Sequence, residues 1–249
     1  MSELNIVLLC LALAVLALFT VSLINHNQMR RRLIGQRLQQ LRKKVSEIEE
    51  LCAGLESLTG SRNIIRALLE HTVEMVDGML TLQPQSQALQ ISKESLESRI
   101  EQLSGAEFAP TLNRAMNSDA QVARAQFGLN EAGRIIRSRQ AAGKMELAAM
   151  NDMIEQLAWA NMMVSVVSAV VQGHKYLNKG DVLQAYSFYK KATQTAMENN
   201  LGDERRHQLI KELVEITNNK RRALSENLMP ETQFNPPDTV ELNPAASPE

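Results

Sequence analysis

The sequence predicts an all-α protein, and three observations support that fold class. Leu, Ala, Met, Gln, Glu and Arg, which favour helix, are abundant, while the 249 residues include only one Trp, three Tyr, five Phe, 11 Gly and 7 Pro. No stretch alternates apolar and polar residues as a half-buried strand does. No proline occurs from Thr111 to Met229, which permits a run of long helices.

Composition and motifs argue against several functional classes. The 27 basic and 28 acidic side chains give a net charge of −1, which argues against bulk attraction to nucleic acid. Two cysteines, Cys10 and Cys52, are too few for a disulfide framework or a self-contained zinc site. The four histidines are scattered, and the glycine-rich phosphate motifs and the G-x-S-x-G motif are missing from the sequence. The sequence therefore predicts no catalytic, cofactor or metal site, and no enzyme.

The first predicted element is a transmembrane helix. Residues 4–24 form an uncharged run, and fourteen of them are Leu, Ile, Val or Phe. A helix of this length spans about 31 Å, close to the hydrocarbon thickness of a bilayer. A cleaved signal peptide is the alternative, but Met1–Glu3 carries no base and no small-residue cleavage site follows the run. An uncleaved anchor is therefore expected.

Basic residues on one flank of this segment predict its orientation. Residues 1–3 contain no Lys or Arg, so the positive-inside rule places the N-terminus outside and the bulk of the chain in the cytoplasm. A bacterial inner membrane suits this topology. The same charges could contact anionic lipid, although a topology signal alone is the simpler interpretation. This basic stretch consists of Arg30, Arg31, Arg32, Arg37, Arg42, Lys43 and Lys44.

A heptad pattern follows the anchor and predicts a helix over residues 29–58. Spacings of four and three residues separate the members of this seam, which are Ile34, Leu38, Leu41, Val45, Ile48, Cys52 and Leu55. One interpretation is a short parallel coiled-coil stalk that forms a homodimer through residues 34–55. The other is an amphipathic helix that packs on its own chain, because Leu51 and Leu58 widen the apolar stripe.

A helical bundle is predicted over residues 61–226. Gly60 and Ser61 interrupt the heptad pattern, and Ser61 is the expected N-cap of a helix that runs to about Thr81. Pro84 ends this helix, and a weaker amphipathic helix follows over residues 86–103. In the proline-free part, Gly128, Gly133 and Gly143 are the expected weak points.

Residues 166–199 carry the one motif with a recognisable mechanism, VVSAVVQGHKYLNKGDVLQAYSFYKKATQTAMEN. Small residues let two antiparallel helices approach closely, two tyrosines fill the space beside them, and Gly180 suits the left-handed turn between the helices. The segment resembles a single tetratricopeptide repeat, with Ala169 and Met197 departing from the family pattern. The residues that carry the resemblance are Gly173, Tyr176, Gly180, Ala185, Tyr189 and Ala192. The resemblance implies a helical hairpin that stacks on neighbours and binds protein.

Two further segments complete the chain. A helix is predicted from Asp203, as N-cap, to Glu226, and it could cover the hairpin. The tail at 227–249 is acidic and rich in proline, with no base, and it is expected to be disordered.

The functional expectation is a membrane-anchored cytoplasmic scaffold or assembly factor that acts through protein–protein interaction. The expected partners are the lipid bilayer and a cytoplasmic protein whose identity the sequence does not give. Two alternatives remain: a structural subunit of a larger inner-membrane complex, and a membrane-tethered nucleic-acid-binding protein. The mixture of acids and bases near the C-terminal helix is typical of a solvated face and argues against the last of these.

Overall fold

The computed structural model describes residues 3–105 and 110–231. In these two ranges the chain forms seven α-helices and no β-strand, which confirms the all-α fold class. The helices are α1 (Glu3–Thr59), α2 (Arg62–Leu82), α3 (Gln87–Ser104), α4 (Asp119–Ala141), α5 (Leu147–Asn178), α6 (Val182–Glu198) and α7 (Glu204–Thr217).

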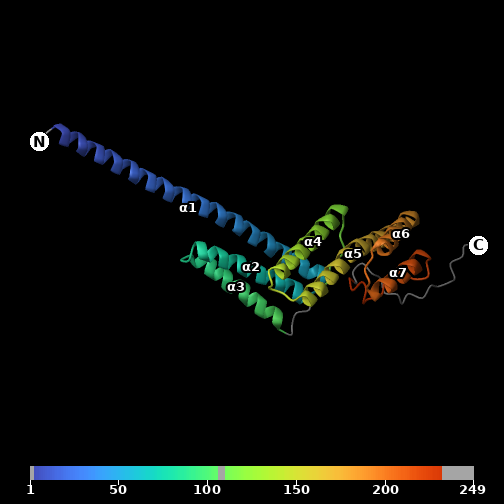
Figure 1. Cartoon of the computed structure of the whole chain (residues 1–249). Coiled ribbons are helices and arrows are strands. Elements are labelled where there is room, and N and C mark those ends of the chain that lie inside the picture. The colour runs from blue at the N-terminus through green and yellow to red at the C-terminus, as the bar shows by residue number, and fades with distance from the viewer. Residues whose placement is uncertain (1–2, 106–109, 232–249) are drawn as a thin grey trace, which may run out of the picture.

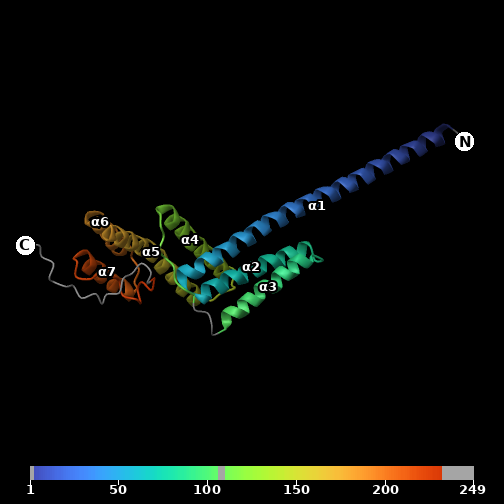
Figure 2. The same ribbon diagram turned by 180° about the vertical axis from the view of Figure 1, so that it is seen from behind.

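Helix α1 is a single helix of 57 residues. It joins the predicted membrane segment and the predicted stalk without a break, and its N-terminal half extends well beyond the other helices (Figures 1 and 2). Nearly all side chains of residues 4–24 lie outside the described part of the structure. Among the residues that are described, α5 is the one helix long and apolar enough to cross a membrane, but 67% of its most apolar window is buried inside the protein.

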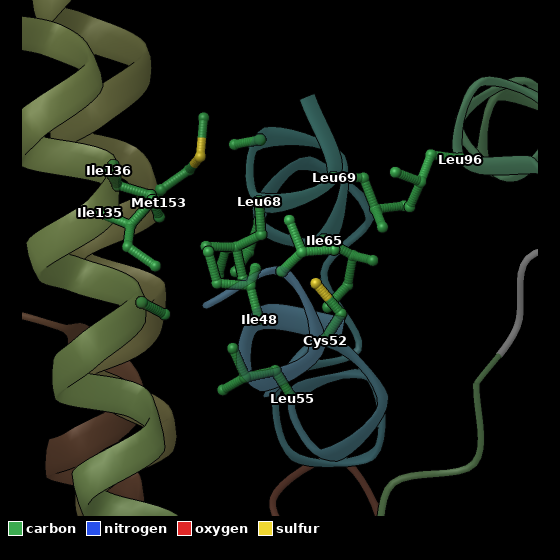
Figure 3. Packing of buried hydrophobic residues seen from close by; sticks show 14 of the residues in the cluster. Ile48, Cys52, Leu55, Ile65, Leu68, Leu69, Leu96, Ile135, Ile136 and Met153 are labelled. Carbon is green, nitrogen blue, oxygen red and sulfur yellow. The ribbon is translucent and has the colours of Figure 1, made fainter. Parts of the chain in front are cut away.

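Helix α2 packs along the C-terminal half of α1, and α3 packs against α2 to form the α2–α3 hairpin (Figure 1). Five of the seven seam residues are buried there, and Figure 3 shows Ile48 and Cys52 of α1 facing Leu68 and Ile65 of α2. This intrachain packing favours the amphipathic-helix interpretation of the heptad pattern. The homodimer through residues 34–55 stays a prediction.

The hydrophobic core consists of two clusters joined by α5. The first contains the C-terminal half of α1 with α2, α3, α4 and the N-terminal half of α5. The second contains the C-terminal half of α5 with α6, α7 and the segment 223–229. Helix α5 is apolar around most of its circumference because it is covered from both sides, as is typical of a central core helix.

Several predicted boundaries differ from the structure for local reasons. Ser61 precedes α2, but its side chain makes no cap hydrogen bond; instead Thr59 Oγ1 accepts from the Ser61 N–H at 3.2 Å. Gly128 and Gly133 lie inside α4, because helix packing tolerates their small cost. Gly143, at φ +71°, does lie in the turn before α5.

The C-terminal region also differs from its prediction. Helix α7 begins after Asp203, whose carboxylate caps it, but the helix ends at Thr217 rather than near Glu226. The left-handed residue Asn219, at φ 54°, redirects the chain. Of the tail expected to be disordered from residue 227, the described part packs into the protein: Leu228 and Met229 belong to the second core cluster. Residues 232–249 lie outside the described residues.

Candidate functional site

All seven side chains of the basic stretch are exposed. They lie on α1, beginning on the part that projects beyond the α2–α3 hairpin and continuing to Lys44 (Figure 1). Arg30, Arg37 and Lys44 are seven residues apart, so they share one face of the helix. Lys43 Nζ lies 3.7 Å from Glu47 Oε1, and this exposed ion pair contributes little to stability. The stretch therefore presents cations to solvent immediately after the predicted anchor.

The residues of the repeat-like motif form a helical hairpin between α5 and α6. Gly180 occupies the connecting turn at φ +81°, a conformation that glycine adopts without steric cost. The Asp181 carboxylate accepts a hydrogen bond from the Gln184 N–H at 3.1 Å and caps α6. The turn and the second helix thus lie where the motif predicts them. Membership of the tetratricopeptide family stays a prediction.

The two helices meet at Gly173 and Tyr189. A Cβ added to Gly173 would lie 2.3 Å from Tyr189 Cε1, so the tyrosine ring rests directly on the glycine backbone. Ala185 and Ala192 are fully buried on the same side of α6. Tyr176 stacks on Phe188, with ring centroids 5.4 Å apart. These residues pack the two helices of the hairpin together.

A buried polar pair accompanies this packing. His174 Nδ1 lies 2.8 Å from the Tyr189 hydroxyl. Burial lowers the pKa of His174 to about 4 and raises the pKa of Tyr189 to about 12. Both groups are therefore neutral at pH 7, and the contact is a neutral hydrogen bond inside the core.

The end of the hairpin exposes apolar side chains. Leu183 is 86% exposed, and Leu177 and Val182 are also exposed. These three residues, called the hairpin tip below, lie on both sides of the Gly180 turn. Leu183 contributes nothing to the core, so formation of helix α6 does not by itself explain why a leucine stands at this exposed position.

A large groove lies between α1 and α4, with α2 as its floor, and sequence analysis did not predict it. Its volume is about 1050 Å³. Its apolar lining comes mainly from Leu41, Ile48, Leu51, Met75, Phe127 and Ile135. We call this feature the α1–α4 groove. It is large enough to hold a peptide segment of several side chains.

The crossing of α1 and α4 shapes this groove. A Cβ on Gly128 would lie 3.0 Å from Leu51 Cδ1, so the two helices approach closely at that glycine. Phe127, the preceding residue, is 71% exposed and lines the groove wall. The pair Phe127–Gly128 is visible in the sequence, but the exposure of the phenylalanine, which marks the groove, is known only from the structure.

The polar groups on the groove are mixed in charge. Lys44 and Arg124 line it together with Glu47 and Glu131, and Glu131 pairs with Arg134. The bond from Arg134 holds the pKa of Glu131 below its usual range. His71 lies on the floor, and burial lowers the pKa of its imidazole. The arrangement is suited to binding an apolar segment and offers no converging set of reactive groups.

The described residues contain no group of three or more His, Cys, Asp or Glu side chains that could hold a metal ion. Cys52 is fully buried, and burial raises the pKa of its thiol to about 12. That thiol is therefore a core residue at physiological pH rather than a nucleophile.

Comparison of the chain with family models, with curated proteins and with solved structures gives no match.

Proposed function

We propose that the protein is a single-pass membrane protein whose cytoplasmic helical domain acts as a scaffold or assembly factor through protein–protein interaction. The observation that carries this proposal is the continuity of α1. One helix of 57 residues runs from the apolar N-terminal segment through the exposed basic stretch and into the hydrophobic core. Movement of the anchor is thereby transmitted to the domain through a stiff element.

The basic stretch supports the proposed orientation. Its seven side chains are exposed on α1 and carry no role in the core. Cations next to an apolar segment retain that side in the cytoplasm, and those close to the surface contribute about 1 kcal/mol each of attraction to an anionic leaflet. Arg30, Arg31 and Arg32 are the basic residues nearest the apolar segment, whereas Arg42, Lys43 and Lys44 lie on the part of α1 that belongs to the helical domain.

The hairpin tip supports the interaction part of the proposal. Leucine at 86% exposure gains from a partner that covers it. The scaffold would use the tip to contact a cytoplasmic protein that presents a complementary apolar surface.

A second candidate function is that of a structural subunit in a larger inner-membrane complex. One observation favours it: Met29 and Leu33 are exposed on the projecting part of α1. Apolar side chains on an isolated helix next to a membrane are suited to contacts with neighbouring membrane subunits.

Membrane attachment is tested with the full-length chain in a bacterial cell. We expect the protein to remain in the membrane after alkaline carbonate extraction. A fluorescent reporter fused to the C-terminus should be active, and a phosphatase that works only in the periplasm should be inactive at the same position. Extraction into the soluble fraction, or an active periplasmic reporter, would contradict the proposal.

The interaction is tested by in-cell photo-crosslinking from the hairpin tip. A photoreactive amino acid at Leu183 should give a discrete adduct with another protein. The matched control is Ile91 on α3, which is 65% exposed and distant from the hairpin in sequence. Adducts of equal yield at both positions would show that the probe at Leu183 reacts with proteins that collide with it at random. The hairpin tip would then no longer support the scaffold proposal.

A further inference from the structure

The described chain ends beside the α1–α4 groove. Glu231 is held by Arg114, whose Nε and Nη2 donate to its two carboxylate oxygens at 2.8 and 3.1 Å. The backbone N–H of Arg114 also donates to Glu231 Oε1 at 3.1 Å. Both side chains are buried, so this contact fixes the position from which the remaining chain departs.

The segment that carries Arg114 borders the groove. Asn113 donates its N–H to the Ser57 carbonyl at 2.8 Å, and Ser57 lines the groove from α1. Met116, two residues after Arg114, also lines the groove. Ser168 of α5 fixes this segment, since its hydroxyl accepts from the Met116 N–H at 2.9 Å. Residue 231 is therefore held next to one end of the groove.

The chain that follows is long enough to occupy the groove. Eighteen residues follow Glu231 in the sequence. Fully extended, they reach about 60 Å. The groove follows α1 from Leu41 to Leu58, which is about 26 Å along the helix axis.

The tail also has the chemistry to fill it. Phe234, Val240 and Leu242 are apolar, and Pro236 and Pro237 lie between the first two of them. Prolines restrict the free chain, so less conformational entropy is lost when it binds. The tail carries acids and no base, while the groove is lined by acidic and basic side chains alike, so the fit of the tail rests on its apolar residues.

We propose that the α1–α4 groove is a binding site for the C-terminal tail of the same chain, residues 232–249, which enters from the buried Arg114–Glu231 pair and places its apolar side chains along Leu51, Met75 and Phe127.

Photo-crosslinking within the full-length protein in detergent micelles tests this proposal. The photoreactive residue p-benzoylphenylalanine replaces Phe234, one aromatic group for another. After irradiation and digestion, mass spectrometry should find intrachain adducts on α1 residues 41–58, on α4 residues 121–135 or on Met75. Equal amounts of isotopically light and heavy protein are mixed beforehand, so that adducts between two chains are identified by mass.

Two variants with matched exposure give the test its control. Phe127→Glu places a carboxylate in the apolar wall, and the adduct yield should fall by about tenfold. Ile91→Glu changes an equally exposed side chain on α3, outside the groove, and the yield should stay at the parent level. Both side chains are exposed, so both variants should fold, and circular dichroism verifies this.

Three outcomes would overturn the proposal. Adducts that join light to heavy chains would assign the groove to a second copy of the protein. Adducts outside the groove would place the tail elsewhere. Groove adducts whose yield is unchanged by Phe127→Glu would indicate random collision.

Discussion

At the scale of single residues, Gly173 determines how closely α5 and α6 pack. Replacing it with Ala places a methyl group 2.3 Å from Tyr189 Cε1, and the ring must move. We expect Gly173→Ala to lower the free energy of unfolding by about 1 to 3 kcal/mol. Thermal unfolding of the full chain in detergent, followed by circular dichroism, measures the change.

Gly78→Ala is the matched control for this prediction. Gly78 is also helical, but a Cβ there has no heavy atom within 4 Å. Its replacement should raise stability by about 0.5 to 1 kcal/mol, since alanine favours helix. If the two variants melt alike, then Gly173 is not at a close helix contact.

His174 makes the stability of the hairpin depend on pH. Its pKa is about 4 when folded and about 6.5 when exposed, so the unfolded chain binds the proton more readily. Stability is therefore complete above pH 6.5 and decreases as pH falls from 6.5 towards 4, by at most about 1.4 kcal/mol per pH unit. Unfolding with urea between pH 7 and pH 4.5 measures this slope.

Substitution separates His174 from the other groups that titrate in this range. His174→Gln should reduce the pH dependence, whereas His207→Gln, at an exposed position, should retain it. The lowered pKa of His71 adds the same pH dependence of stability to both variants, so this contribution cancels in the comparison. An unchanged slope in His174→Gln would contradict the prediction.

At the scale of elements, the Arg114–Glu231 pair attaches the C-terminal segment to the loop before α4. Glu231→Gln removes one charge and leaves the buried guanidinium unpaired. We expect a loss of about 3 to 5 kcal/mol in the free energy of unfolding. Glu226→Gln, at an exposed position five residues earlier, should change stability by about 0.5 kcal/mol or less.

A double variant shows whether the pair itself accounts for that loss. When Arg114 and Glu231 are both replaced by Leu, no buried charge is left without a partner. The double variant should therefore be more stable than Glu231→Gln alone. A double variant less stable than the single one would assign the effect to packing in this region.

Elements with local signals could be predicted from the sequence. The predicted N-cap Ser61 directly precedes the first residue of the observed α2, and the predicted end at about Thr81 differs from the observed end by one residue, because Gly60 and Pro84 bound the pattern on either side. The Gly180 turn and the Asp203 cap were predicted correctly for the same reason. Backbone conformation at these positions is set by the residue itself.

Features that depend on distant residues could not be predicted in this way. Arg114 and Glu231 are separated by 117 positions, and their pairing orders a segment whose composition indicates disorder. The α1–α4 groove likewise depends on the contact between Gly128 and Leu51. The heptad seam was ambiguous because the same apolar stripe suits a second chain or helix α2.

At the scale of the whole molecule, α1 connects the predicted anchor with the helical domain. Among the described side chains between the predicted anchor and Leu38, all except the half-buried Ile34 are exposed, and from about Leu38 onward α2 covers the helix. At 1.5 Å per residue, this uncovered part holds the domain about 20 Å from the end of the apolar segment. The proposed scaffold needs α1 to remain one stiff helix across Gly35, where an added Cβ would have no heavy atom within 4 Å.

The stiffness of α1 is the last prediction, and distance measurement between two spin labels tests it. Labels at Leu33, which is 64% exposed, and at the exposed Ala53 are 20 residues apart. A continuous helix places their backbones about 30 Å apart with a narrow distribution. Cys10 is replaced by Ser to avoid extra labelling, while the native Cys52 stays unlabelled because it is buried and its pKa is raised to about 12. Gly35→Ala, which favours helix, should leave the distribution unchanged, and Gly35→Pro should broaden and shorten it. A broad distribution in the parent protein would place a hinge at Gly35, and the domain would then be tethered flexibly rather than held at a fixed height above the membrane.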